Sequence, residues 1–151
     1  MRKYSCYIPV ILILISFCSI ILFRGSLTRY ASRIMTNGME PEEKSIVENI
    51  ISEQYDYSKN TKEYECTFLE FGSVGCNSCR QMESVMAEIK HKYSNRVKVV
   101  FINVSQKENR ELVDYFGIVT IPTQVLLDKK GKEYFRHNGY LSSDDLSKHF
   151  K

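Results

Sequence analysis

A β-rich run, a short loop and an amphipathic helix follow one another directly in the middle of the chain, and two cysteines stand where the loop meets the helix. The run ECTFLEFG predicts a strand that ends at Gly72. The segment GSVGCNSCR then leads into a predicted helix from Asn77 to about Tyr93. The apolar stripe of this helix is expected to face the core and consists of Met82, Val85, Met86 and Ile89. This succession predicts an α/β unit with Cys76 and Cys79 at the start of its helix.

The alternation of helices and strands continues to the C-terminus and is preceded by one further helix. Apolar spacing and turn residues predict the order helix, strand, helix, strand, helix, strand, strand, helix. The expected ranges are 41–54, 65–72, 77–93, 97–104, 108–115, 120–128, 132–140 and a last helix capped at Ser142. The run VKVVFINV is almost continuously apolar, so we expect it to be buried on both faces and central in the sheet. The order predicts an α/β domain over residues 41–151, with a mixed sheet flanked by helices.

The N-terminal region has the pattern of an export or membrane signal. A positive start, MRK, leads into a run from Ile8 to Phe23 that carries no charge. We expect residues 1–25 to be a membrane anchor or a cleaved signal peptide. The anchor is favoured because no small-residue cleavage pattern follows the apolar run. Residues 26–40 are polar and mixed and are expected to form a tether.

The orientation of this segment predicts where the domain lies. A first apolar helix preceded by positive charge most often carries the following domain out of the cytoplasm. We therefore expect an extracytoplasmic domain, either anchored in the membrane or exported after cleavage, in a compartment where disulfides can persist. A lipid-modified Cys18 is not favoured, because Phe17 rather than a small residue precedes it.

The spacing of Cys76 and Cys79 allows a redox dithiol, a structural disulfide or half of a metal site. At the start of a helix both sulfurs lie on one face, and the backbone N–H groups there favour the thiolate of Cys76. Cys76 would then attack a substrate disulfide, and the less exposed Cys79 would resolve the mixed disulfide. A disulfide of this spacing closes a loop too small to restrain the unfolded chain much. Because no second Cys-x-x-Cys pair exists and the three histidines show no paired spacing, no metal is expected.

Several motifs together resemble the thioredoxin family in order and spacing: TFLEFGS, the Cys-x-x-Cys pair at a helix start, VVFINV, FGIVTIPT and HNGY. The resemblance covers residues 41–151 and implies a thioredoxin-like fold. It implies a cis peptide bond before Pro122, with this proline beside Cys76. It also implies that a substrate chain pairs with the main chain of Ile121. The full set of substrate-binding positions that it implies is Gly75, Ile121, Pro122 and Gly139.

Several positions depart from the usual thioredoxin pattern. Glu70 stands where the family carries an aspartate that accepts the proton of the second thiol, and Phe101 replaces a nearby lysine. Desolvation without that cation should raise the pKa of the Glu70 carboxyl; the alternative is an exposed or differently paired Glu70. Gly75 replaces a tryptophan, which predicts a more open, less aromatic substrate surface. Asn77 and Ser78 replace Gly-Pro and can shift the redox potential in either direction.

The resemblance implies a thiol–disulfide oxidoreductase, and Ile121 before the proline favours a reductase of disulfides in exported proteins. Its expected partners are disulfide-bearing proteins and a membrane thiol carrier that supplies electrons. An oxidase of the same fold and a non-catalytic binding module remain as alternatives. With 21 basic and 18 acidic residues spread along the chain, no nucleic-acid partner is expected. No cofactor is expected either. Of the remaining cysteines, Cys66 is interpreted as a buried inert thiol. Cys6 and Cys18 are interpreted as apolar fillers of the N-terminal segment.

Overall fold

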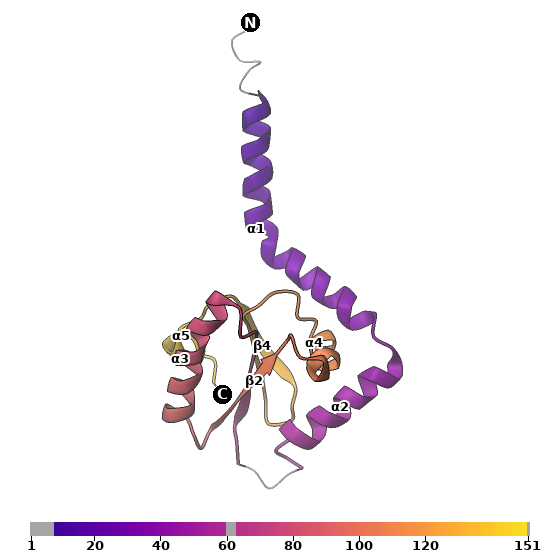
Figure 1. The fold of residues 1–151 in the computed structure, drawn as a ribbon, viewed down its shortest axis with the longest axis vertical. Helices are drawn as coiled ribbons and strands as arrows, with labels where there is room; N and C mark the ends of the chain where they lie inside the picture. Colours follow the sequence, from indigo (N-terminus) through magenta and orange to yellow (C-terminus); the bar gives the residue numbers. More distant parts are fainter. Residues whose placement is uncertain (1–7, 60–62, 151) are drawn as a thin grey trace, which may run out of the picture.

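The computed structural model describes residues 8–59 and 63–150. A long helix, α1 (Ile8–Asn37), precedes a domain in which helices cover both faces of a four-stranded sheet (Figure 1). The elements of the domain are α2 (Pro41–Tyr55), β1 (Cys66–Gly72), α3 (Asn77–Lys92), β2 (Val97–Asn103), the 3-10 helix η1 (Lys107–Asn109), α4 (Arg110–Tyr115), β3 (Thr123–Leu127), β4 (Glu133–Asn138) and α5 (Ser143–Ser147). The predicted order of elements and the predicted mixed sheet are confirmed.

The sheet has the strand order β2-β1-β3-β4. β1 pairs in parallel with β2 and antiparallel with β3, and β3 pairs antiparallel with β4. β1 is therefore an inner strand, and all of its residues are buried. The prediction that 97–104 is central is wrong, because β2 lies at the edge of the sheet. The prediction of burial on both faces is also wrong, because only Val97 and Ile102 of this strand are buried and Phe101 is 40% exposed. An apolar side-chain pattern does not report whether the strand's edge is paired or its faces are covered.

The side chains of β1 alternate between two cores, because successive residues of a strand point to opposite faces. Leu69 and Phe71 pack against Val47 and Ile51 of α2. On the other face, Phe68 packs against α3 and α5 in a cluster that includes Met82, Val85, Met86, Ile89 and Leu146. The predicted apolar stripe of α3 is thus confirmed. Each such fully buried side chain contributes roughly 1.5–3 kcal/mol to the free energy of unfolding, so β1 is held firmly from both sides.

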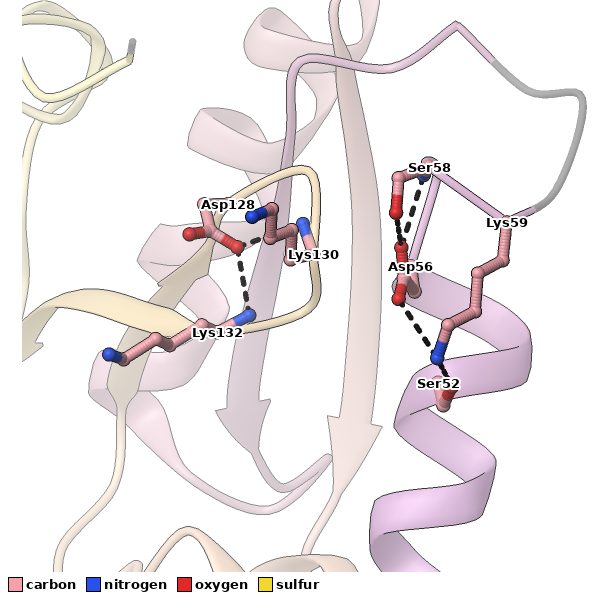
Figure 2. Close-up of polar contacts among 7 residues, drawn as sticks. All are labelled: Ser52, Asp56, Ser58, Lys59, Asp128, Lys130 and Lys132. Carbon is pink, nitrogen blue, oxygen red and sulfur yellow. Dashed lines mark hydrogen bonds and ion pairs between the residues drawn. The ribbon is translucent and has the colours of Figure 1, made fainter.

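Two aspartates organise the turns at the end of the domain that lies away from α1 (Figures 1 and 2). Asp128 Oδ1 accepts hydrogen bonds from the N–H groups of Lys130 at 2.9 Å and Lys132 at 3.0 Å, which closes the predicted turn between β3 and β4. Asp56 follows α2, accepts hydrogen bonds from Ser58 and forms an ion pair with Lys59 at 3.3 Å. Short polar side chains that bond to the nearby backbone stabilise turns in this way.

α1 continues as a helix through most of the segment predicted to be a tether. Its two halves, Pro9–Ile21 and Gly25–Asn37, are bent by 56°. Among the described residues no single helix has the length and apolar character to cross a membrane, and these halves meet that requirement only as a bent pair. The second half contacts the domain, where Thr36 Oγ1 donates a hydrogen bond to the carbonyl of Tyr115 at 3.1 Å. The segment boundaries at residues 25 and 40 stay predictions, and the positive start of the predicted signal lies outside the described residues.

Candidate active site

Three loops meet at the end of the sheet where β1 finishes. Because β3 runs antiparallel to β1 and β4 runs antiparallel to β3, the last residues of β1 and β4 and the first residue of β3 lie at the same end. The register pairs Phe71 with Thr123, and Thr123 with Asn138. These strand ends adjoin the cysteine loop, the loop that holds Pro122 and the loop that holds Gly139. The topology therefore brings together the segments that were predicted to form the site.

Cys76 and Cys79 form a disulfide at the start of α3, with their Cα atoms 5.2 Å apart. Cys76 is the residue that caps the helix, and its sulfur accepts a hydrogen bond from the N–H of Cys79 at 3.2 Å. Ser78 Oγ lies 3.3 Å from the same sulfur. Cys76 is partly exposed, whereas Cys79 is 3% exposed. The first sulfur is therefore the one that a substrate can reach, and it lies where the free N–H groups of the first helical turn favour negative charge.

Glu70 is fully buried and lies on the face of the sheet that also holds Cys79. Glu70 and Gly72 are two residues apart on β1, so both face the α3 side. A Cβ atom on Gly72 would lie 3.3 Å from the Cβ of Cys79 and 3.4 Å from its sulfur. The Cα atom of Glu70 is thus about 6.6 Å along the strand from that of Gly72, the residue that contacts Cys79. An exposed Glu70 is ruled out by its exposure of 0%, while its role as a proton acceptor stays a prediction.

The Glu70 carboxyl has a hydrogen-bond partner on β3, the side chain of Gln124. Gln124 Nε2 lies 3.1 Å from Oε2 and 3.3 Å from Oε1 of Glu70. Burial raises the pKa of Glu70 from its ordinary 4.5 to about 8, and the hydrogen bond from Gln124 offsets part of this rise. Phe101 is the β2 neighbour of Glu70 in the sheet register and brings no charge. The predicted rise and its cause are confirmed, and most of the carboxyl is protonated at neutral pH.

Gln124 is a buried polar site residue that sequence reasoning missed. It is fully buried, and its Oε1 has no hydrogen-bond partner among the described residues. A protonated Glu70 can donate to that oxygen only if the amide is rotated, and the rotation would place Nε2 at the position that has no partner. The only sequence signal was a polar residue inside the apolar run TIPTQVLLD. That signal does not identify the partner, because the two residues are 54 positions apart.

The Ile121–Pro122 peptide bond is cis, as the family resemblance implied. The N–H of Gly139 donates to the carbonyl of Pro122 at 2.8 Å, and Thr123 Oγ1 donates to the carbonyl of Thr120 at 2.7 Å. These bonds hold the loop in place. Ile121 is partly exposed, and its main chain makes no hydrogen bond to another described backbone group. Its N–H and carbonyl are therefore free to pair with an extended substrate, a role that stays a prediction.

The surroundings of the disulfide are open and apolar. Gly75 is exposed, and a Cβ atom there would meet no other atom within 4 Å. Val74, Val119 and Tyr140 are 77%, 40% and 51% exposed, and they belong to the three loops that meet at this end of the sheet. Sequence reasoning missed these side chains because each loop holds only one or two of them. Exposed apolar side chains gathered at one end of a domain are typical of an interaction surface.

The remaining cysteines are far from this chemistry. Cys66 begins β1 at the opposite end of the strand, is 1% exposed and is unpaired, which confirms the predicted buried thiol. Burial raises the pKa of this thiol. Cys18 is exposed on α1 and unpaired, and Cys6 lies outside the described residues. Within 8–59 and 63–150, no three His, Cys, Asp or Glu residues are grouped as they would be around a metal.

The fold and this site define a class of protein: a thioredoxin-like domain with a Cys-x-x-Cys disulfide at the N-terminus of a helix. A family model described as a thioredoxin-like domain matches residues 51–151, more than half of the chain. The chain therefore belongs to the thioredoxin-like domain family. This membership and the Cys76–Cys79 pair support a thiol–disulfide oxidoreductase.

Curated relatives and solved structures agree with this assignment. The chain is 33% identical over 78 residues to thioredoxin of Alicyclobacillus acidocaldarius, which covers 52% of this chain and 71% of that protein. It is 33% identical over 67 residues to the chloroplastic thioredoxin-like protein HCF164 of Oryza sativa, but this match spans 44% of the chain and only 26% of that protein. Thioredoxin-2 of a malaria parasite superposes with a TM-score of 0.51 at 25% identity, over 56% of this chain and 84% of that one. A thioredoxin mutant of Halobacterium salinarum superposes with a TM-score of 0.53 at 23% identity, over 64% of this chain and 81% of that one.

Proposed function

We propose that this protein is a membrane-tethered thiol–disulfide oxidoreductase that reduces disulfides in exported proteins. The observation that carries the proposal is the Cys76–Cys79 disulfide, with a partly exposed first sulfur beside a buried second one. The free main chain of Ile121 offers a strand-like docking edge at the same end of the sheet.

The proposed reaction is two successive thiol–disulfide exchanges. The Cys76 thiolate of the reduced protein attacks one sulfur of the substrate disulfide, and the other substrate sulfur leaves with the electron pair of the broken S–S bond. The Cys79 thiolate then attacks the Cys76 sulfur of the mixed disulfide and releases the second substrate sulfur as a thiolate. Each released thiolate takes up a proton. Two electrons pass to the substrate, and a dithiol donor, proposed to be a membrane thiol carrier, returns two electrons to the Cys76–Cys79 disulfide.

In its ionised form, which is the minor fraction at neutral pH and grows as the pH rises toward its pKa of about 8, Glu70 is proposed to take the proton of Cys79 as that thiol becomes a nucleophile. Proton transfer is most efficient between groups of similar pKa. The raised pKa of Glu70, about 8, lies close to the ordinary value of about 8.5 for a cysteine thiol. An ordinary exposed glutamate would be too weak a base for this step.

The membrane tether is proposed from the first half of α1. Apolar side chains on all sides of this half are exposed, from Val10 at 52% to Ile13 and Phe17 at 65%. A helix that is apolar all round is usually buried in a core or a membrane. Resistance of the chain to extraction from membranes by alkaline carbonate would support an anchor, and digestion of its domain by protease added outside intact cells would support an extracytoplasmic position. Release by carbonate would contradict the anchor.

The activity is tested with the full chain, dithiothreitol and insulin as the disulfide substrate. We expect wild type to accelerate insulin reduction and Cys76→Ser to abolish the acceleration. Mixed with insulin in the absence of dithiothreitol, pre-reduced Cys79→Ser should accumulate mixed disulfides that added reducing agent then cleaves. Cys66→Ser is the matched control and should keep full activity. Full turnover by Cys76→Ser would overturn the proposed nucleophile.

The direction of electron flow is tested by the reduction potential of the Cys76–Cys79 pair. A value near about −270 mV supports a reductase, whereas a value near about −120 mV would make the protein an oxidase. A disulfide that mild thiols do not reduce would instead support a binding module. Trapping the partners of Cys79→Ser in cells identifies the substrates.

A further inference from the structure

A groove of about 890 Å³ lies between the second half of α1 and the proposed substrate-binding loops. One wall is formed by α1 and includes Thr28, Arg29, Ser32 and Arg33. The opposite wall includes Ile121 and Gly139. The groove therefore continues directly from the main chain that is proposed to pair with substrate. The wall formed by α1 lies outside residues 51–151, which the family model matches. The helix therefore adds a surface to the thioredoxin-like domain.

Close packing against the domain holds α1 in this place. Gly117 has φ +56, and a Cβ atom built there would lie 2.9 Å from Thr36 Oγ1 and still closer to Ser32. The hydrogen bond from Thr36 to the carbonyl of Tyr115 adds a polar contact just before this glycine. Because Ser32 and Thr36 are four residues apart, they lie on one face of the helix, and Arg29 and Arg33 follow the same spacing beside them. Docking through the small residues thus aims the two arginines along the groove.

The charge of the groove is positive. Arg29 and Arg33 are exposed, and neither forms an ion pair with a described residue. The acidic lining residue, Glu133, is already paired: its two oxygens accept hydrogen bonds from Arg136 at 2.8 Å and 2.7 Å. His137 also lines the groove. Two guanidinium groups that have no ion-pair partner in the described part of the chain therefore lie beside the proposed substrate edge.

We propose that this groove binds an acidic segment of the protein substrate, next to the disulfide that is reduced. This inference rests on the proposed function and names its substrate class. Arg29 and Arg33 would pair with Asp or Glu side chains of the substrate while its backbone lies along Ile121, since guanidinium groups match carboxylates in two-pronged hydrogen bonds. A membrane lipid headgroup offers the same charge. The groove, however, opens onto Ile121 and Gly139, where a peptide can pair with the main chain of Ile121 and a lipid cannot.

The first test compares two disulfide-bridged peptides that differ only in glutamate or glutamine beside the disulfide. With the full chain in neutral detergent at low salt, we expect kcat/KM to be about fivefold higher for the glutamate peptide. The preference should shrink at high salt, because ions screen exposed charges. Arg29→Gln/Arg33→Gln should remove the preference, so that kcat/KM becomes about equal for the two peptides. Lys129→Gln/Lys130→Gln, in the turn at the far end of the domain, removes the same charge and should keep the preference.

The second test separates this inference from the proposed function. Fluorescence anisotropy measures binding of a cysteine-free acidic peptide to Cys76→Ser/Cys79→Ser protein, which has no redox activity. Binding that is about fivefold weaker after Arg29→Gln/Arg33→Gln supports the groove even if no disulfide is reduced. Equal binding of acidic and neutral peptides overturns it even if reduction is rapid. If the two substitutions weaken only the association with phosphatidylglycerol vesicles, the arginines serve the membrane and the inference is overturned.

Discussion

The two ends of β1 place cysteines in opposite surroundings. Cys66 begins the strand among apolar side chains, is 1% exposed, and has its thiol pKa raised by burial. Cys76 follows the other end of the strand, is partly exposed, and has the N–H of Cys79 directed at its sulfur. The residue type is the same at both places. The difference teaches that solvent access and a helix N-terminus, rather than cysteine itself, make a redox site.

The buried polar side chains of β1 show a second contrast between the same two ends. Near Cys66, the hydroxyl of Thr67 is satisfied by a hydrogen bond of 2.6 Å to the hydroxyl of Tyr57. Near the disulfide, Glu70 is ionisable and its two carboxyl oxygens accept from the Gln124 amide, whose own oxygen has no hydrogen-bond partner in the described part of the chain. A neutral, satisfied pair stabilises the fold, whereas a buried acid with incomplete partners costs stability when it ionises. We infer that ionisation of Glu70 lowers the free energy of unfolding at the end of β1 near the disulfide.

The largest expected effect is the difference in alkylation rate between the thiols of Cys76 and Cys66. After reduction of a Cys6→Ser/Cys18→Ser background, iodoacetamide at neutral pH should modify Cys76 on the order of 100-fold faster than Cys66, because the buried thiol must wait for local opening. Peptide mass spectrometry over time measures the two rates. In guanidinium chloride the rates should become similar, and similar rates in the folded protein would contradict the contrast.

The second prediction concerns the pH dependence of stability that Glu70 causes. Its pKa is about 8 in the folded protein and ordinary, about 4.5, in the unfolded chain. Between these values the folded state binds the extra proton, so the free energy of unfolding should fall as pH rises from about 5 to 8. Glu70→Gln should remove this fall, a difference on the order of 2–4 kcal/mol at pH 8. Urea unfolding at several pH values measures it.

The matched control for this pH effect is Glu83→Gln, on the exposed face of α3. This variant should keep the pH dependence of wild type. If Glu70→Gln and wild type lose stability equally between pH 5 and 8, Glu70 does not cause the pH dependence. The proposed difference between Thr67 and Glu70 would then be wrong.

The smallest expected effect compares two glycines that are three residues apart at the redox end. Gly72→Ala would place a Cβ 3.0 Å from the Phe101 ring and 3.3 Å from the Cβ of Cys79, which should cost about 1–2 kcal/mol. Gly75→Ala points into open space and should change the free energy of unfolding by less than about 0.5 kcal/mol. Chemical unfolding of the oxidised proteins measures both, and equal costs would show that β1 and Cys79 are not tightly packed.

The sequence was informative wherever neighbouring residues decide the structure. The cap at Ser142 forms as predicted, since its hydroxyl accepts a hydrogen bond from the N–H of Asp145 at 3.2 Å. The turn at Asp128 also forms as predicted. The cis bond before Pro122 followed from the family resemblance rather than from spacing. The position and the burial of β2 were predicted wrongly, because apolar character alone does not determine whether a strand's edge is paired or its faces are covered.

The residues alone thus determined the strand, the cysteine pair and the helix that follows it, because hydrophobic period, capping and turn chemistry act over a few residues. The resemblance also placed Glu70 near the site, and the raised pKa was predicted from its desolvation by burial without a nearby cation. Tertiary structure alone decided that Gln124 is its partner, across 54 residues, and that Thr36 of α1 packs onto Tyr115, across 79. Contacts of that kind depend on which surfaces meet after folding, and no local pattern encodes both members of such a pair.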